Sequence, residues 1–119
     1  MRYEVILTED ADFDLEEIYD YIALHDAPAK AAYILDGMEG VIESLSLFPE
    51  RGSYPKELLD LGICEYRQTF FKPYRVIYRV IGSVVYVQLV TDGRREMTSL
   101  LAKRLFGLRS GGRSCQAPD

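Results

Sequence analysis

The feature that most constrains this chain is a run of three strand-like segments joined by connections of only two or three residues. Segments 63–70, 74–81 and 84–91 are rich in β-branched and aromatic residues. Lys72-Pro73 separates the first two segments, and Gly82-Ser83 separates the last two. Because such short connections join antiparallel neighbours, we predict a three-stranded antiparallel meander.

The first half of the chain predicts one strand and a pair of helices. Residues 2–7 are typical of a strand, and Thr8 is placed to cap a helix that ends near His25. Asp26 is the expected cap of a second helix, with Pro28 in its first turn. The short connection makes the two helices an antiparallel hairpin. Apolar stripes at helical spacing support both helices: Ala11, Leu15, Ile18, Tyr19 and Ile22, then Ala31, Leu35, Met38, Ile42 and Leu45.

The remaining segments complete an α+β fold in one domain. Residues 94–108 predict a short C-terminal helix, so residues 1–108 are expected to form a single domain. Residues 109–119 contain Gly, Ser, Arg and Pro with little apolar content, which predicts a disordered tail. The start has no long apolar stretch, and no uncharged run is long enough to span a bilayer. We therefore expect a cytoplasmic protein without membrane contact.

The net charge of −5 hides a strong asymmetry between the two halves. Residues 1–50 hold 13 acidic and 2 basic residues, whereas residues 51–119 hold 6 acidic and 12 basic residues. This split indicates one basic working face and one acidic, solvated face. The alternative for the acidic half is that its carboxylates simply favour the exposed sides of two helices.

The middle strand of the meander holds the candidate site. Period-two alternation puts Val76, Tyr78 and Val80 on a face that should pack against the helices, and Arg75 and Arg79 on the other. Arginine suits bidentate contact with phosphate or carboxylate. The alternative is that Arg75 and Arg79 pair with Glu65 and neighbouring acids. We expect five arginines to converge on one open face as a target- or phosphate-binding site: Arg67, Arg75, Arg79, Arg94 and Arg95.

The sequence offers no obvious catalytic or metal centre. His25 is the only histidine, and its place at a helix end favours a capping role. The acids between residues 9 and 20 spread around a helix rather than forming a carboxylate pair. Cys64 and Cys115 do not form a C-x-x-C pair, so no zinc site is expected. We predict no metal and no cofactor.

Five short motifs follow one another along the chain: Asp14-Leu15-Glu16-Glu17-Ile18, Phe48-Pro49-Glu50-Arg51-Gly52, Glu65-Tyr66-Arg67, Tyr74-Arg75-Val76-Ile77-Tyr78 and Asp92-Gly93-Arg94-Arg95. In their order and spacing they resemble the RelE/ParE superfamily of toxins from type II toxin–antitoxin modules. The resemblance covers about residues 2–108 and implies two N-terminal helices packed on a mainly antiparallel sheet. It also implies a cognate antitoxin that wraps the toxin in a hetero-oligomer.

The resemblance leaves the target open between two branches. RelE-type members cut messenger RNA on the ribosome, and ParE-type members poison DNA gyrase. This chain is similar to the nuclease branch at Arg75 and Arg95, with Arg67 as a third candidate. It lacks that branch's lysines around residues 65–68 and its tyrosine around residues 97–101. The net charge of −5 also fits ribosome binding poorly.

We therefore favour a ParE-type gyrase inhibitor that is not an enzyme. A RelE-type nuclease is the first alternative, and a non-toxic relative that only binds its antitoxin is the second. For the antitoxin, small residues on the two helices and their acidic faces predict close contact with a basic partner segment. The alternative is that these small residues pack against the chain's own sheet, which we favour for Gly37.

Overall fold

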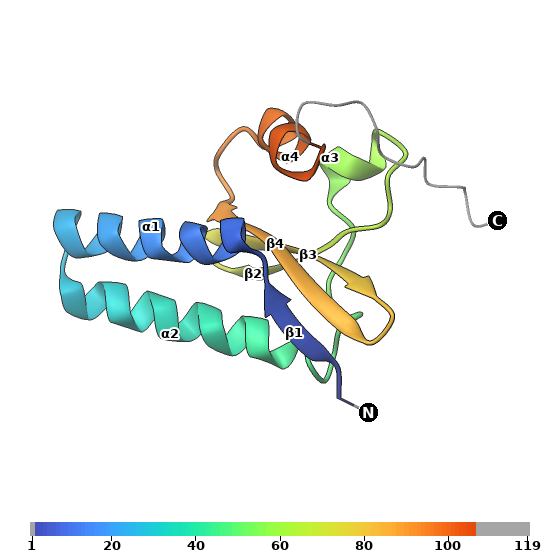
Figure 1. Cartoon of the computed structure of the whole chain (residues 1–119). Helices are drawn as coiled ribbons and strands as arrows, with labels where there is room; N and C mark the ends of the chain where they lie inside the picture. The colour runs from blue at the N-terminus through green and yellow to red at the C-terminus, as the bar shows by residue number, and fades with distance from the viewer. Residues whose placement is uncertain (1, 107–119) are drawn as a thin grey trace.

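The meander that the two short connections predict lies at the centre of the molecule. The computed structural model describes residues 2–106, and their strands form one sheet in the order β1-β4-β3-β2 (Figure 1). The elements in chain order are β1 (Glu4–Leu7), α1 (Glu9–His25), α2 (Pro28–Ser44), α3 (Lys56–Leu59), β2 (Arg67–Phe71), β3 (Tyr74–Ile81), β4 (Val84–Asp92) and α4 (Met97–Phe106).

The predicted α+β fold class is confirmed. β2, β3 and β4 pair antiparallel in sequence order, and β1 adds a parallel edge strand against β4. Gly82 has a φ of 61° in the β3–β4 turn, a conformation that favours glycine. None of the helices in residues 2–106 is long and apolar enough to cross a membrane. The predicted tail, residues 109–119, and the last two residues of the predicted domain lie outside the described residues.

The two long helices form the predicted antiparallel hairpin on one side of the sheet (Figure 1). Thr8 caps α1 as expected, because its side-chain oxygen accepts a hydrogen bond from Ala11 N. The prediction that Asp26 caps α2 is wrong. Ala27 takes that position with extended backbone and no side-chain bond, and Asp26 instead forms an ion pair with Lys30 at 2.9 Å.

The first hydrophobic core lies between this hairpin and the sheet. Val76 and Tyr78 of β3 are fully buried there against Met38 and Ile42 of α2. Gly37 permits a close approach, since a Cβ at this position would overlap the Phe71 ring. The expectation that Gly37 serves packing against the chain's own sheet is therefore confirmed.

The opposite face of the sheet is covered, so the expectation of an open face is wrong. Ile77 and Leu89 point away from the hairpin and are buried in a second core. Leu58 of α3 and Leu101 of α4 complete this core, and Figure 1 shows α3 and α4 together over this side of the sheet. The arginines of the sheet consequently lie around a second core rather than on a free surface.

Two element boundaries differ from the sequence prediction. β2 begins at Arg67 rather than at residue 63, because Ile63 N bonds to Leu58 O and the Ile63 side chain enters the second core. α4 begins at Met97 rather than at residue 94, because Glu96 accepts hydrogen bonds from the N–H groups of Thr98 and Ser99 and so caps the helix there.

An ion pair joins α4 to α1 and β4. Arg104 donates two hydrogen bonds of 2.9 Å to the Asp14 carboxylate. Asp14 also accepts a bond of 3.0 Å from Val90 N, and Arg104 reaches Gln88 O at 3.2 Å. Gln88 is the extra residue of a β-bulge, because Ile77 pairs with Leu89 while Tyr78 pairs with Val87. This contact fixes the C-terminal helix over the sheet.

Candidate target-binding surface

Arg75 is the most constrained of the five candidate arginines. It is only 8% exposed, and both of its terminal nitrogens donate to the Glu57 carboxylate at 3.0 Å. Its Nε donates to the Gln68 side-chain oxygen at 2.9 Å. The hydrogen bond from Arg75 lowers the pKa of Glu57 below its usual range. The charge of Arg75 is therefore already matched by an acceptor from the chain itself.

Arg67 does not lie on the sheet face that holds Arg75 and Arg79, contrary to our expectation. Arg67 pairs with Tyr78 across the hairpin, so it shares the face of Tyr78. Its guanidinium donates to Gly52 O at 2.8 Å and to Tyr54 Oη at 3.1 Å, and it stacks over the Tyr54 ring. Arg67 thus holds the loop before α3 against the edge of the sheet.

Arg79 sits at the same edge, in a small pocket that Arg67 also lines. Its guanidinium lies 3.8 Å from the Glu65 carboxylate and 5.6 Å from the centre of the Tyr66 ring. The alternative in which Arg79 pairs with Glu65 is therefore confirmed. Arg75 also pairs with an acid, although the acid is Glu57, and the pair is only partly exposed, at 10% for Arg75 and 27% for Glu57.

Arg94 and Arg95 follow β4 and differ in their surroundings. Arg94 donates two bonds to the Asp92 carboxylate, at 2.9 and 2.6 Å, and these bonds lower the pKa of Asp92 from 3.8 to about 2. Arg95 is exposed and lines a groove of about 480 Å³ between α1 and the end of β4. Within residues 2–106, its side chain has no hydrogen-bond or ion-pair partner.

The five arginines therefore form a distributed set rather than one basic face. Four of them contact acceptors from the chain itself, and Arg95 alone among the five has no side-chain partner within the described residues. Sequence reasoning missed Glu57 and Gln68, the two acceptors of Arg75. Gln68 could have been predicted from the sequence, because a two-residue turn at Lys72-Pro73 places it on the face of Arg75. Glu57 could not have been predicted, since its position depends on how α3 packs.

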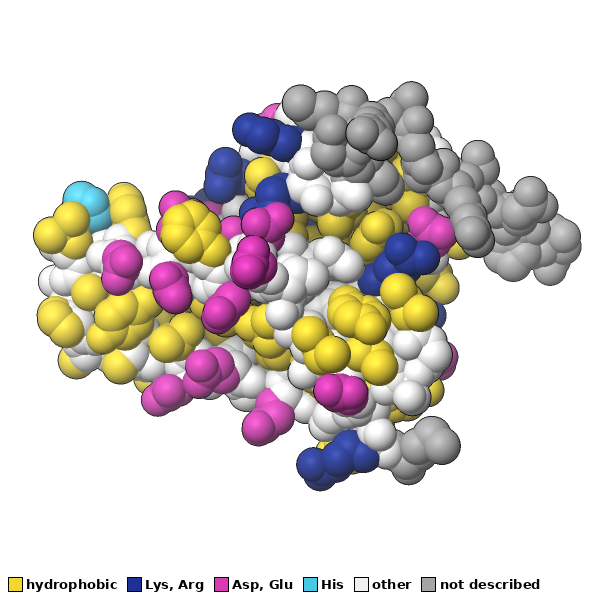
Figure 2. Space-filling model, viewed as in Figure 1, with side chains coloured by type: hydrophobic (Ala, Val, Ile, Leu, Met, Phe, Trp, Pro, Cys, Tyr) yellow, Lys and Arg dark blue, Asp and Glu magenta, His cyan; other side chains and the backbone are white. Residues whose placement is uncertain are grey.

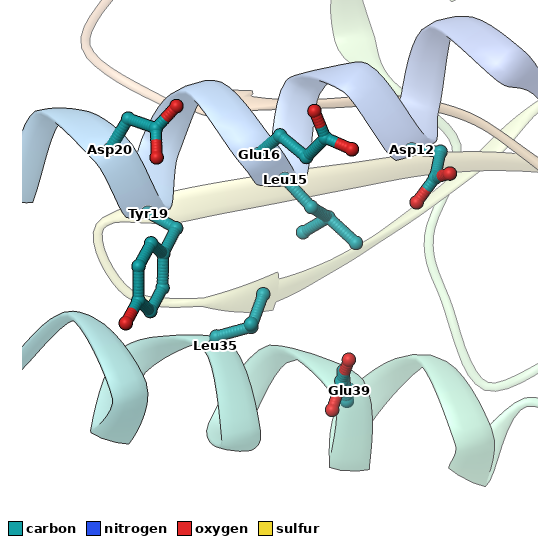
Figure 3. A pocket seen from close by; sticks show the side chains of 7 residues that line it. All are labelled: Asp12, Leu15, Glu16, Tyr19, Asp20, Leu35 and Glu39. Carbon is teal, nitrogen blue, oxygen red and sulfur yellow. The ribbon is translucent and has the colours of Figure 1, made fainter.

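The acidic half of the chain forms a second candidate surface on the helical hairpin. Figure 2 shows acidic side chains spread over α1 and α2 with apolar side chains between them and few basic ones nearby. A groove of about 350 Å³ lies between the helices. Leu15 and Leu35 form its floor, with Tyr19 beside them (Figure 3). Four carboxylates surround the floor: Asp12, Glu16, Asp20 and Glu39.

Metal-ligating side chains do not cluster in the part of the chain that the structure describes. No group of three or more His, Cys, Asp or Glu side chains in residues 2–106 is placed to hold a metal ion. His25 lies in the last turn of α1 and stacks against Tyr21, with the ring centres 4.3 Å apart. A depression of about 500 Å³ lies beside Arg75, between α3, the β2–β3 turn and the segment after β4, and His25 is not among the residues that line it.

Comparison with solved structures shows the same fold in toxins of two kinds. A structure titled as the chromosomal ParDE system of P. aeruginosa matches with a TM-score of 0.65 at 19% identity, over 76% of this chain and 96% of that chain. The toxin–antitoxin complex RelBE2 of Mycobacterium tuberculosis matches at 0.54 and 22%, over 77% and 92%. A mutant of E. coli RelE in the free state matches at 0.58 and 16%, over 92% and 100%.

Sequence comparison relates this chain to the ParE toxins. Toxin ParE3 of Caulobacter vibrioides is 29% identical over 100 residues, which is 84% of this chain and 96% of that protein. A family model described as the ParE toxin of the type II toxin–antitoxin system parDE matches residues 5–97. With a match over most of its length, and with the strand, helical hairpin and meander in place, this chain belongs to the ParE toxin family.

Proposed function

We propose that this ParE-type toxin inhibits DNA gyrase by binding it as a protein partner, and that a cognate antitoxin neutralises it in a hetero-oligomer. The family match and the relation to Toxin ParE3 support the class of protein. The observation that favours gyrase over messenger RNA is that Arg75 already has a partner. Both of its terminal nitrogens donate to the Glu57 carboxylate, so the strongest candidate for a phosphate contact is occupied by an acid of the chain itself.

The chemistry around the arginines gives further support to a binding role. An RNA-cleaving site needs groups that accept and donate a proton near neutral pH, each contributing about 10²–10⁴-fold in rate. Burial raises the pKa of Tyr66, Tyr74 and Tyr78 above that of a free tyrosine. The Arg75 hydrogen bond lowers the pKa of Glu57, which makes this carboxylate a weaker base. These groups are thus poorly suited to proton transfer at neutral pH.

A supercoiling assay with purified gyrase tests the target directly. We expect the chain to block supercoiling of relaxed plasmid and to accumulate gyrase-cleaved DNA, and addition of the antitoxin should reverse both effects. Normal supercoiling without cleaved DNA, at concentrations that arrest growth, would exclude the gyrase proposal. Such an inhibitor would act in the cytoplasm, where gyrase and DNA are found.

Two other outcomes identify the alternatives. A nuclease would give cut messenger in a ribosome-bound primer-extension assay, and Arg75→Ala or Arg95→Ala would abolish the cuts. A chain that harms no host and still binds its antitoxin would be the non-toxic relative. A short neighbouring gene with a DNA-binding N-terminus would identify the antitoxin for these experiments.

The groove between α1 and α2 is the surface that we assign to the antitoxin. Its apolar floor and the four carboxylates around it fit an amphipathic segment with basic residues along its edges. We expect Glu16→Lys and Glu39→Lys each to weaken the complex. The matched control is Glu43→Lys, which makes the same charge change at an exposed position of α2 that does not line the groove. Equal affinity for all three variants, or a complex that leaves both helices uncovered, would exclude this surface.

A further inference from the structure

The side of the sheet that faces away from the helical hairpin is only partly covered. Ile77 and Leu89 lie in the second core under α3 and α4. Toward the Gly82 turn, the same side carries a patch of apolar side chains that belong to neither core: Ile6, Ile81, Val84 and Tyr86. Ile81 is 49% exposed and Ile6 36%, and Figure 2 shows apolar side chains gathered over β1 and the neighbouring end of β4. Because a solvated sheet face normally carries polar residues, this sheet patch indicates a contact surface.

The strand pairing gives the sheet patch a definite pattern. Two rows of side chains cross the sheet here, each with one residue from β3, one from β4 and one from β1. The rows are Arg79, Tyr86 and Ile6, then Ile81, Val84 and Glu4. Cross-strand partners share a face, so all of these side chains lie on the same side of the sheet. The patch is therefore apolar across its middle, with a cation and an anion at diagonally opposite corners.

The two corner charges are available to a partner. Glu4 is exposed and has no ion-pair partner within residues 2–106. The Arg79 side chain is 34% exposed, and its contact with Glu65, at 3.8 Å, is longer than a hydrogen bond. By contrast, Arg75 is only 10% exposed and bonds to Glu57 at 3.0 Å. Arg79 is thus the arginine of β3 that can reach a carboxylate from outside the chain.

We propose that the sheet patch is the interface of a homodimer, in which two copies of this chain pack face to face. Contacts in a two-fold dimer are reciprocal. A two-fold axis in the plane of contact, perpendicular to the line from Arg79 to Glu4, places Arg79 of each copy against Glu4 of the other. The apolar side chains then meet in the middle. The strands of the two copies cross at a large angle, as in orthogonal sheet packing, and α3 and α4 of each copy lie beyond the free β1 edge of the other.

The charge pattern favours a second copy over the other partners of a toxin. The antitoxin segment that we assign to the groove between α1 and α2 is basic, whereas the sheet patch carries one charge of each sign. Two copies that met at their helical hairpins would bring acidic surfaces together (Figure 2), which is unfavourable. The sheet patch is small for an interface, so we expect a weak dimer that forms at high protein concentration. This dimer does not depend on which target the toxin inhibits.

Sedimentation velocity of the purified chain, from micromolar to millimolar concentration, measures the association. We expect the average mass to rise with concentration toward that of a dimer. Ile81→Lys puts a charge into the middle of the patch and should weaken the dimer about tenfold or more. The matched control is Leu24→Lys, because it introduces the same charge at an apolar position that is 80% exposed near the end of α1. This control should associate as the wild type does.

A charge exchange tests the arrangement of the two copies. Glu4→Lys would face Arg79 of the other copy, and Arg79→Glu would face Glu4, so each variant alone should associate about tenfold more weakly than wild type. Mixed together, the two variants should associate with each other about as tightly as wild type, because both corner contacts then join opposite charges. In the control mixture Glu43→Lys, at an exposed position of α2, replaces Glu4→Lys and should not restore association with Arg79→Glu.

Thermal melting checks that the variants are folded. If Arg79→Glu is poorly folded, Arg79→Gln takes its place, and it should associate with Glu4→Lys more tightly than Glu4→Lys associates with itself.

Three results would overturn the proposal. The first is a chain that stays monomeric at every concentration. The second is equal weakening of the dimer by Ile81→Lys and Leu24→Lys. The third is a failure of the two charge variants to associate with each other. If the chain is monomeric and Ile81→Lys weakens antitoxin binding or gyrase inhibition more than Leu24→Lys does, the sheet patch belongs to that partner instead of a second copy.

Discussion

Asp14→Ala should destabilise the chain more than any other single loss of a carboxylate from α1. Asp14 accepts three hydrogen bonds, two from Arg104 and one from Val90 N. The variant leaves the Arg104 charge without its main partner and leaves a backbone N–H of β4 unsatisfied. Arg104 Nε is buried and has no hydrogen-bond partner among the described residues, so only the more distant Asp10 carboxylate, 3.8 Å away, remains to offset the charge.

The size of the loss follows from the burial of the pair. Removing one partner of a buried ion pair costs about 3–5 kcal/mol. The two side chains are 11% and 19% exposed, and Asp10 lies 3.8 Å from Arg104 Nε, so some solvation and a second carboxylate remain. We therefore expect the lower end of that range, about 3 kcal/mol. For a domain of this length the melting temperature should fall by about 12 °C.

Urea titration and thermal melting of purified variants provide the measurement. Asp20→Ala is the matched control, because it removes an exposed carboxylate from the same helix and should change stability by less than about 0.5 kcal/mol. In an Arg104→Met background, Asp14→Ala should cost much less, because the partner charge is already gone. A loss no larger than that of Asp20→Ala, or additive effects of the two changes, would refute this account.

Three further predictions concern single contacts of the fold. Tyr78→Phe removes the buried hydroxyl that bonds to Gly52 N and Pro49 O and should cost about 1–3 kcal/mol in urea titration, whereas the exposed Tyr33→Phe should be neutral. Gly37→Ala should destabilise the chain, because its Cβ would overlap the Phe71 ring. Gly40→Ala has open space around it and should stabilise the chain by about 1 kcal/mol. A change of melting temperature in the same direction for both variants would be inconsistent with this packing. Because Arg94 lowers the pKa of Asp92 to about 2, the stability from this charge is complete above the unfolded pKa and is lost as the pH falls toward 2. The stability gap between wild type and Asp92→Asn should therefore narrow from about pH 5 downward, and a constant gap would disprove the linkage.

Local periodicity was sufficient to predict the elements and the first core. The alternation of Val76 and Tyr78 with Arg75 and Arg79 correctly placed the apolar face of β3 against the helical hairpin. The two-residue turn also determines the register between β2 and β3, but our prediction of the face on which Arg67 lies did not use that register. A turn at Lys72-Pro73 pairs Phe70 with Arg75 and so puts Arg67 on the opposite face.

Contacts between distant segments were not predictable from periodicity. Ile77 alternates with arginines, and the sequence alone does not indicate that α3 and α4 fold over it. Glu57 meets Arg75 across 18 residues, and Asp14 meets Arg104 across 90. Such pairs depend on the packing of whole elements. An arginine-rich strand therefore indicates where cations lie along the chain and leaves open which of them are neutralised in the fold.

The positions of the two candidate surfaces constrain how neutralisation can work. The acidic groove lies on the helical hairpin, whereas the depression beside Arg75 lies on the side of α3 and the β2–β3 turn, across the sheet from the first core. A partner segment confined to the groove would leave the depression accessible. If the antitoxin binds only the groove, amide hydrogen exchange in α3 should be the same in the free toxin and in the complex. If the antitoxin also covers α3, exchange there should slow on complex formation, so one exchange experiment with and without antitoxin measures how far the partner extends around the toxin.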